Sequence, residues 1–125
     1  MSHSTEVPVL SASAMGGHTY SAPGGTGVHR RATRLDGAAL LYAIGEFDVG
    51  SVACLRQALA DAHDDQATSI RLDLTGVTFG DAAFLDTLVH TRQGPGRLIL
   101  LGPVPPPIRR LLDLTRTTHL FHFAA

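Results

Sequence analysis

The chain has 125 residues, 44% of them hydrophobic, and its formal net charge at pH 7 is −1. This length allows one domain with an ordinary hydrophobic core, and the dispersed charges offer no basic field for nucleic acid or an anionic membrane. No apolar run approaches the roughly 20 residues that span a bilayer, and the N-terminus lacks the basic start and long apolar segment of a secretory signal. We therefore expect a cytoplasmic protein that binds no nucleic acid and does not insert into a membrane.

Residues 1–28 combine Ser, Thr, Gly, Ala, His and Pro without a lasting helix or strand period. This composition predicts a disordered tail, followed by one folded domain over residues 29–125. The glycines of residues 24–27 do not indicate a phosphate loop, because His29 stands where such a loop needs a lysine.

A strand pair and a helix are predicted next. Residues 29–35 are compatible with a short strand, and the hairpin signal at residues 36–37 leads into a second strand over residues 38–44. This second strand is apolar on both faces, which indicates a central position in a sheet. Residues 45–48 are expected to end it, and a helix follows over about residues 49–63. The apolar stripe of this helix consists of Val52, Leu55, Leu59 and Ala62.

Residues 69–89 hold the clearest local signals in the chain. Apolar and polar side chains alternate over residues 70–74, which predicts a strand with two different faces. A loop is expected at residues 75–80. Asp81 precedes an apolar run and is predicted to be the N-cap of a helix that fades near Gln93.

The C-terminal part is predicted to add one strand and one helix. Residues 98–101 form a short apolar run bounded by turns, which is typical of a strand buried on both faces. Three prolines at residues 105–107 start a helix that runs through Thr115. Residues 118–123 form either an edge strand or an irregular end. The order of elements predicts an open α/β sheet with right-handed crossovers.

Cysteine and histidine usage gives no sign of a metal or cofactor. Cys54 is the single cysteine and lies among apolar residues of a predicted helix, so we interpret it as a core residue rather than a reactive thiol. Of the seven histidines, only His119 and His122 share a short interval outside the N-terminal segment, and no His-Glu-x-x-His helix is present. We expect no metal site and no cofactor.

Three landmarks carry a resemblance to a known family: residues 45–48 (GEFD), residues 72–81 (LDLTGVTFGD), and residues 100–103 (LLGP) with residues 108–112 (IRRLL). In this order and spacing they resemble the STAS domain of bacterial anti-sigma factor antagonists, over about residues 31–123. The resemblance implies an α/β fold with a STAS-like open mixed sheet of four to five strands and three to four helices. It also implies a transcription regulator that acts by protein binding and is not an enzyme.

The family partner implied by the resemblance is an anti-sigma factor of the serine-kinase type, or a related ATPase-fold protein. In the family, that kinase phosphorylates a serine directly after the aspartate that starts the second helix. This chain has Ala82 at the serine position and Ala83 after it, so phosphorylation there is chemically impossible. Phe84 stands where the family has a glycine, and it either provides a new apolar anchor or partly blocks the surface.

The resemblance places the partner-binding surface at the start of this helix and in the neighbouring loop. Its expected residues are Glu46, Asp48, Thr78, Gly80, Asp81, Ala82, Ala83 and Phe84. Asp81 serves as helix cap, as a recognition group, or as both, and the loop with Glu46 and Asp48 either contacts a basic group or a metal ion or simply caps the first helix. Thr75 and Thr78 are the nearby hydroxyls open to phosphorylation. An exposed Phe84 would also favour a homodimer.

Two alternative functions stay open. One is a STAS subunit that binds the ATPase of a membrane lipid-transport complex. The other is a small metal-dependent nucleotide-binding enzyme that uses Glu46, Asp48 and Asp81. This enzyme lacks a phosphate-gripping lysine, since the chain contains none.

Overall fold

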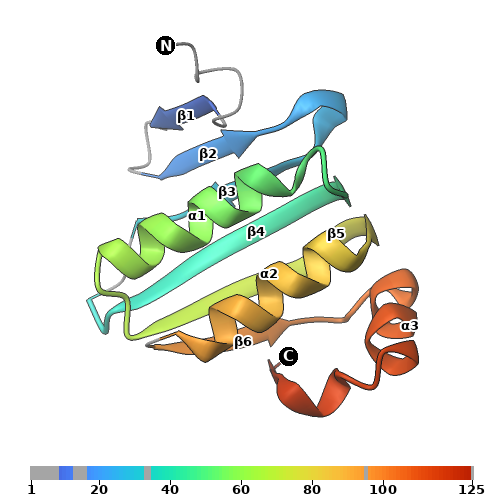
Figure 1. Ribbon diagram of the computed structural model, residues 1–125. Helices are drawn as coiled ribbons and strands as arrows, with labels where there is room; N and C mark the ends of the chain where they lie inside the picture. The colour runs from blue at the N-terminus through green and yellow to red at the C-terminus, as the bar shows by residue number, and fades with distance from the viewer. Residues whose placement is uncertain (1–8, 13–16, 33–34, 95, 125) are drawn as a thin grey trace.

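The structure is a computed structural model that describes residues 9–12, 17–32, 35–94 and 96–124. Within these residues, seven strands form one sheet in the order β1 to β7 (Figure 1). Strands β1 to β4 pair antiparallel and strands β4 to β7 pair parallel, so the sheet is mixed. The strands are β1 (Val9–Ala12), β2 (His18–Ser21), β3 (Gly27–Arg30), β4 (Ala38–Phe47), β5 (Ser69–Gly80), β6 (Arg97–Leu101) and β7 (His122–Ala124).

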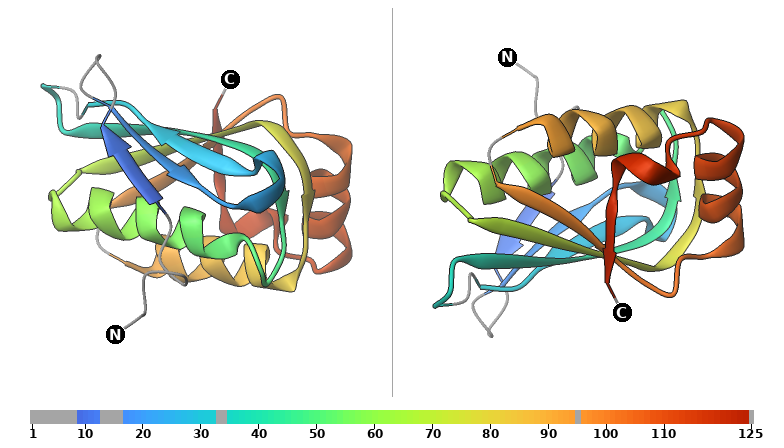
Figure 2. Two further views of the ribbon diagram at one scale, coloured as in Figure 1. Left: turned by 90° about the horizontal axis from the view of Figure 1, so that it is seen from above. Right: turned by 90° about the horizontal axis from the view of Figure 1, so that it is seen from below.

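Three α-helices in the described part of the chain connect the parallel strands: α1 (Val52–Asp64), α2 (Ala82–Gln93) and α3 (Pro106–Leu114). Helices α1 and α2 lie side by side on one face of the sheet, whereas α3 lies at one end of it, next to β5 (Figure 2). Two short 3-10 turns are η2 (Pro23–Gly25) and η3 (Thr118–Leu120). Among the described residues, no helix is both long and apolar enough to cross a membrane.

The predicted fold class is confirmed, although the sheet is larger than expected. It has seven strands across the described ranges rather than four to five, because β1 and β2 lie in the predicted tail and β7 adds a C-terminal edge. The starts of α2 and α3 agree with the sequence prediction, which relied on Asp81 and on the prolines at residues 105–107.

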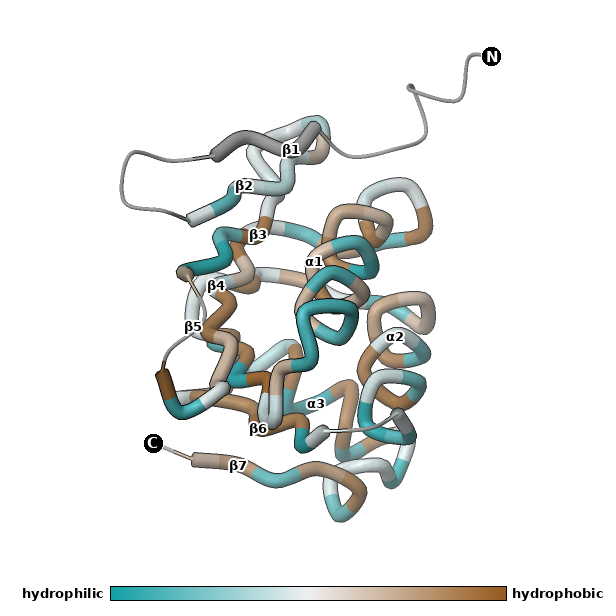
Figure 3. Tube along the Cα trace, turned by 90° about the vertical axis from the view of Figure 1, so that its left-hand side faces the viewer, coloured by the Kyte–Doolittle hydropathy of each residue, from teal (hydrophilic) through white to brown (hydrophobic). Residues whose placement is uncertain are grey.

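The hydrophobic core lies between the sheet and the two helices that cover one face. Hydrophobic residues recur along the central strands and along α2 (Figure 3), and the alternating residues Ile70, Leu72 and Leu74 of β5 are buried. The predicted apolar stripe of α1 is also buried. Each of these patterns follows from the helix and strand periods, since only one side of each element faces the core.

The opposite face of the sheet carries no helix in the described structure. In β4, Ala39 and Leu41 are buried under the helices, whereas Tyr42 is half-buried and Ile44 is 51% exposed on the other side. In β6, Ile99 is likewise half-buried. The prediction that β4 is central is confirmed by its pairing with β3 and β5. The prediction that residues 98–101 are buried on both faces is wrong, because α1 and α2 both pack on the same face.

Strands β4 and β5 run further than the sequence predicts. The expected strand end at residues 45–48 and the expected loop at residues 75–80 are instead paired with each other, as far as Phe47 opposite Gly80. The register shifts twice, between Tyr42 and Ile44 and between Gly45 and Glu46 of β4, and each time β5 carries one extra residue. These irregularities break the simple alternation of side chains, which is why the segment resembles a loop in the sequence.

The predicted disordered tail is wrong for its second half, while residues 1–8 and 13–16 of that tail lie outside the described residues. Strands β2 and β3 belong to the sheet, and Tyr20 of β2 is fully buried. The Tyr20 hydroxyl donates a hydrogen bond of 2.6 Å to Asp61 of α1. Arg30, only 4% exposed, donates from Nη2 to Asp65 at 2.6 Å. Contacts with α1 far along the sequence therefore order a segment whose composition indicates disorder.

Removal of the Tyr20 hydroxyl is expected to destabilise the protein and to change its response to alkali. Burial and the bond to Asp61 raise the pKa of Tyr20 to about 12, above its ordinary value of 10.0. The neutral phenol therefore contributes stability that is fully present below pH 10 and is lost as the pH rises towards 12. Tyr20→Phe should lower the free energy of unfolding by about 1 kcal/mol at neutral pH.

Urea unfolding of both proteins across this pH range measures the effect. The stability difference between wild type and Tyr20→Phe should shrink as the pH rises from 10 to 12. The control is Tyr42→Phe on the open face, whose hydroxyl has no hydrogen-bond partner among the described residues. A constant difference for Tyr20→Phe over this range would contradict the prediction.

Candidate partner-binding site at the start of α2

The ends of β4 and β5 and the starts of α1 and α2 meet at one end of the molecule (Figure 1). Phe47 pairs with Gly80, and the Asp81 N–H donates to the carbonyl oxygen of Phe47 at 3.2 Å. The predicted residues Glu46 and Asp48 therefore lie beside the predicted residue Asp81. This juxtaposition agrees with the sequence prediction that both segments contribute to one surface.

Asp81 caps α2 as predicted. Its backbone is extended, with φ −110° and ψ −163°, and its Oδ1 accepts hydrogen bonds from the N–H groups of Ala83 at 2.9 Å and Phe84 at 3.3 Å. These are free donors of the first helical turn, which a carboxylate satisfies well. The carboxylate is half-exposed. Its role as a cap therefore leaves it accessible to a partner.

The loop before α1 is held by a similar arrangement. Oδ1 of Asp48 accepts from the N–H groups of Gly50 at 2.9 Å and Ser51 at 3.0 Å. The Ser51 hydroxyl donates to the carbonyl oxygen of Glu46 at 2.7 Å. Residues 46 and 47 are the end of β4, and these contacts support the interpretation that a turn beginning at Asp48 leads into α1. Over the described ranges, no group of three or more His, Cys, Asp or Glu residues is placed to hold a metal ion.

Phe84 is not a surface anchor, so the prediction that it contacts a partner is wrong. Its side chain is fully buried, and its ring packs on that of Phe47 with centroids 5.6 Å apart and planes tilted by 31°. A Cβ added at Gly80 would lie only 2.5 Å from the Phe84 ring. The absence of a side chain at Gly80 thus makes room for the Phe84 ring. Both residues lie in the core beneath the surface residues and hold the strand end and the helix start together. The expectation of a homodimer through an exposed Phe84 loses its basis.

The remaining predicted residues surround exposed apolar groups that the sequence prediction missed. Phe79 is 46% exposed and Val49 is 82% exposed. Phe79 pairs with Glu46 across the two strands, so an aromatic ring and a carboxylate lie at neighbouring positions. Simple alternation from Ile70, Leu72 and Leu74 would place residue 79 on the outward face, but the sequence prediction treats residues 75–80 as a loop and so misses this exposure. The signal available in the sequence was the position of these two apolar residues: Val49 directly follows Asp48, and Phe79 lies two residues before Asp81.

We call the exposed part of this region the α2-start surface. Of the predicted residues, Glu46, Asp48, Thr78 and Ala82 are exposed, Asp81 and Ala83 are half-buried, and Gly80 and Phe84 are buried. The α2-start surface consists of Glu46, Asp48, Val49, Thr78, Phe79, Asp81, Ala82 and Ala83. It combines apolar groups with three carboxylates and offers no hydroxyl at residues 81–85.

Two further predicted groups have clear structural roles. Thr75, the other hydroxyl near the helix start, donates from its N–H and its hydroxyl to Oδ1 of Asp73 at 2.8 and 2.5 Å. Cys54 is buried, its thiol lies 3.2 Å from the Ser51 carbonyl oxygen, and burial raises its pKa to about 11. This environment supports the interpretation of Cys54 as a core residue, since a reactive thiol needs a lowered pKa.

Unequal effects are expected for the two phenylalanines of this region. Phe84→Ala should lower the free energy of unfolding by roughly 3–5 kcal/mol, because it leaves a cavity between α2 and the strand ends. Phe79→Ala should lower it by only about 1 kcal/mol, because nearly half of the side chain is already exposed to solvent. Denaturant unfolding of both variants is the measurement, and similar losses of stability would contradict the assignment of one ring to the core and the other to the surface.

Comparisons with known proteins agree with this architecture. A family model described as "Mlab, STAS domain" matches residues 31–122. No curated protein matches the chain. Among solved structures, an anti-sigma factor antagonist from Mycobacterium paratuberculosis is 24% identical, with a TM-score of 0.68 over 82% of this chain and 88% of that chain. The unphosphorylated form of the anti-sigma factor antagonist SpoIIAA is 19% identical, with a TM-score of 0.57 over 70% of this chain and 80% of that chain.

At these identities the two solved structures show a shared fold. The family model spans most of the chain, including strands β4 to β6 and all three α-helices. The resemblance found in the sequence is thereby confirmed. The chain belongs to the STAS domain family.

Proposed function

We propose that this protein is a regulatory binding module that acts as an anti-sigma factor antagonist and docks on its partner through the α2-start surface. The observation that carries the proposal is the exposed Phe79 beside Glu46 and Asp81, at a helix start in a STAS fold. Both structural neighbours are anti-sigma factor antagonists. An aromatic anchor with a charged rim is the usual composition of a protein-binding site.

The charge of the α2-start surface indicates what kind of partner fits it. Glu46, Asp48 and Asp81 form no ion pair within the described part of the chain. Their negative charges therefore remain available to a basic partner, and complementary charge of this kind raises the rate of association and fixes orientation. We infer that the partner presents arginine or lysine side chains around an apolar pocket for Phe79. An anti-sigma factor of the serine-kinase type is the proposed partner.

The start of α2 cannot carry a phosphate switch in this protein. A phosphate at a helix N-terminus is stabilised by free N–H groups, and it would add up to two negative charges to the docking surface. Ala82 is exposed at that position but has no hydroxyl, and neither has Ala83. Control of binding must therefore come from the amounts of the two proteins or from another group. Thr78 is the exposed hydroxyl nearest in sequence to Asp81.

Docking through Phe79 is tested by binding measurements with the anti-sigma factors of the host. Phe79→Ala should weaken binding by roughly 30-fold, the effect of losing a hot spot of about 2 kcal/mol. The matched control is Leu35→Ala, since Leu35 is an exposed apolar residue in the turn before β4, at the opposite end of that strand. Equal affinities of the Phe79→Ala variant and wild type would exclude this surface. Failure of wild type to bind any of the anti-sigma factors would exclude the partner.

A second candidate partner is the ATPase of a membrane lipid-transport complex. The observation that favours it is the pair Ala82 and Ala83, because such an ATPase has no need to reverse binding by phosphorylating the module. The same surface serves both partners in this proposal. Gene neighbourhood and co-purification separate them.

Restoring the missing hydroxyl distinguishes the two candidates directly. Ala82→Ser places a hydroxyl on the exposed first residue of α2. With a serine-kinase partner and ATP, this variant should gain one phosphate by intact mass and release the partner, whereas wild type should gain none at residues 81–85. The control is Ala60→Ser, an exposed position in the middle of α1. Tight binding of the Ala82→Ser variant without phosphate transfer would instead support the transport ATPase.

A further inference from the structure

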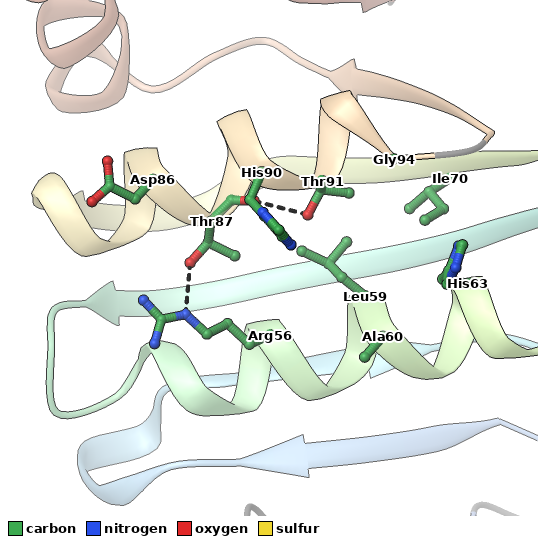
Figure 4. A pocket seen from close by; sticks show the side chains of 10 residues that line it. All are labelled: Arg56, Leu59, Ala60, His63, Ile70, Asp86, Thr87, His90, Thr91 and Gly94. Carbon is green, nitrogen blue, oxygen red and sulfur yellow. Dashed lines mark hydrogen bonds between the residues drawn. The ribbon is translucent and has the colours of Figure 1, made fainter.

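A groove of about 640 Å³ lies between α1 and α2 (Figure 4). Its apolar lining includes Leu59 and Ala60 from α1 and Ile70 from β5, and Leu59 and Ile70 are buried. A volume of this size lies within the range of about 300–1,000 Å³ that is typical of small-molecule sites. The groove shares no residue with the α2-start surface.

A tethered arginine lies at one end of the groove. Nε of Arg56 donates to Oγ1 of Thr87 across the gap between the helices, at 3.1 Å. Thr87 is itself 5% exposed and donates to the carbonyl oxygen of Ala83 at 2.8 Å. This bond holds the guanidinium in place while its two terminal nitrogens have no acceptor among the described residues. Arg56 thus presents a pre-oriented pair of donors, the geometry that suits a carboxylate or phosphate.

The other polar side chains of the groove include two possible hydrogen-bond donors to an anion. His63 and His90, from the last turns of α1 and α2, also line the groove, and in Figure 4 His90 lies between Arg56 and His63. Asp86 is the one carboxylate on the rim, and in Figure 4 it points away from Arg56. Asp86 forms no ion pair with Arg56. An arginine and two imidazoles therefore line a groove with an apolar floor, in a protein whose net charge is −1.

We propose that this groove binds an amphiphilic anion, with an aliphatic chain over Leu59 and Ile70 and a carboxylate or phosphate monoester on Arg56. The apolar floor would contact the aliphatic chain of the ligand, and the terminal nitrogens of Arg56 would donate hydrogen bonds to its acid group. The site is independent of the proposed partner of the α2-start surface.

The test is a titration of the ¹⁵N-labelled full chain with octanoate, octyl phosphate and 1-octanol, followed by NMR. At least one of the two anions should give saturable shifts of the amides of Leu59, Ile70 and Thr87, and the tighter one identifies the acid group. Arg56→Gln should lower the affinity for the anion by about tenfold, as expected for the loss of a charge-assisted pair. The same variant should leave the affinity for octanol unchanged. The matched control is Arg71→Gln, an exposed arginine of β5.

A second variant tests the groove independently of charge. Ala60 is exposed on the groove wall, so Ala60→Trp should fill the space and abolish anion binding while the dispersed amide spectrum shows an intact fold. The proposal is overturned if no anion gives saturable shifts, if octanol binds as tightly as the anions, or if Arg56→Gln has no effect. Shifts of the groove amides only on addition of a protein partner would equally overturn it and make the groove part of a protein interface.

Discussion

The packing of Phe84 against Phe47 and Gly80 is the constraint on which the candidate site depends. The ring occupies space that any side chain at position 80 would fill, and it joins the first turn of α2 to the ends of β4 and β5. Because protein cores are close-packed, this contact fixes where the strand ends and where the helix begins. Asp81 and Phe79 stand directly on that joint. The core thus determines the geometry of the surface above it.

Helices cover only one face of the sheet, and this arrangement explains most of the burial pattern that could be predicted from the sequence. Buried positions in β5 and α1 recur with the strand and helix periods, and the caps and prolines that start α2 and α3 act within a few residues. Such local signals need no knowledge of the fold. The open face is less visible in the sequence, because Tyr42 and Ile99 are apolar yet only half-buried.

The features that the sequence did not predict depend on contacts between distant residues. Tyr20 bonds to Asp61 and Arg30 bonds to Asp65, and these pairs are 41 and 35 residues apart in the chain. The residues around β2 are mostly Ser, Thr, Gly, Ala and Pro, with His18 and Tyr20 among them, and this composition favours disorder when taken alone. The burial of Val77, which departs from the alternation of Ile70, Leu72 and Leu74, depends likewise on register shifts between β4 and β5. Such long-range pairing has no local signature.

The charges of α1 and α2 show which residues serve the fold and which need another explanation. Asp48 and Asp81 accept hydrogen bonds from backbone N–H groups just before α1 and in the first turn of α2, so both can be retained for stability alone. Arg56 is different. It lies in the second turn of α1, beyond the first turn in which the helix dipole acts, and its Nε is held by Thr87 of the neighbouring helix. This bond joins the two helices and leaves the terminal nitrogens of a fixed cation beside an apolar groove, an arrangement for which the proposed anionic ligand accounts.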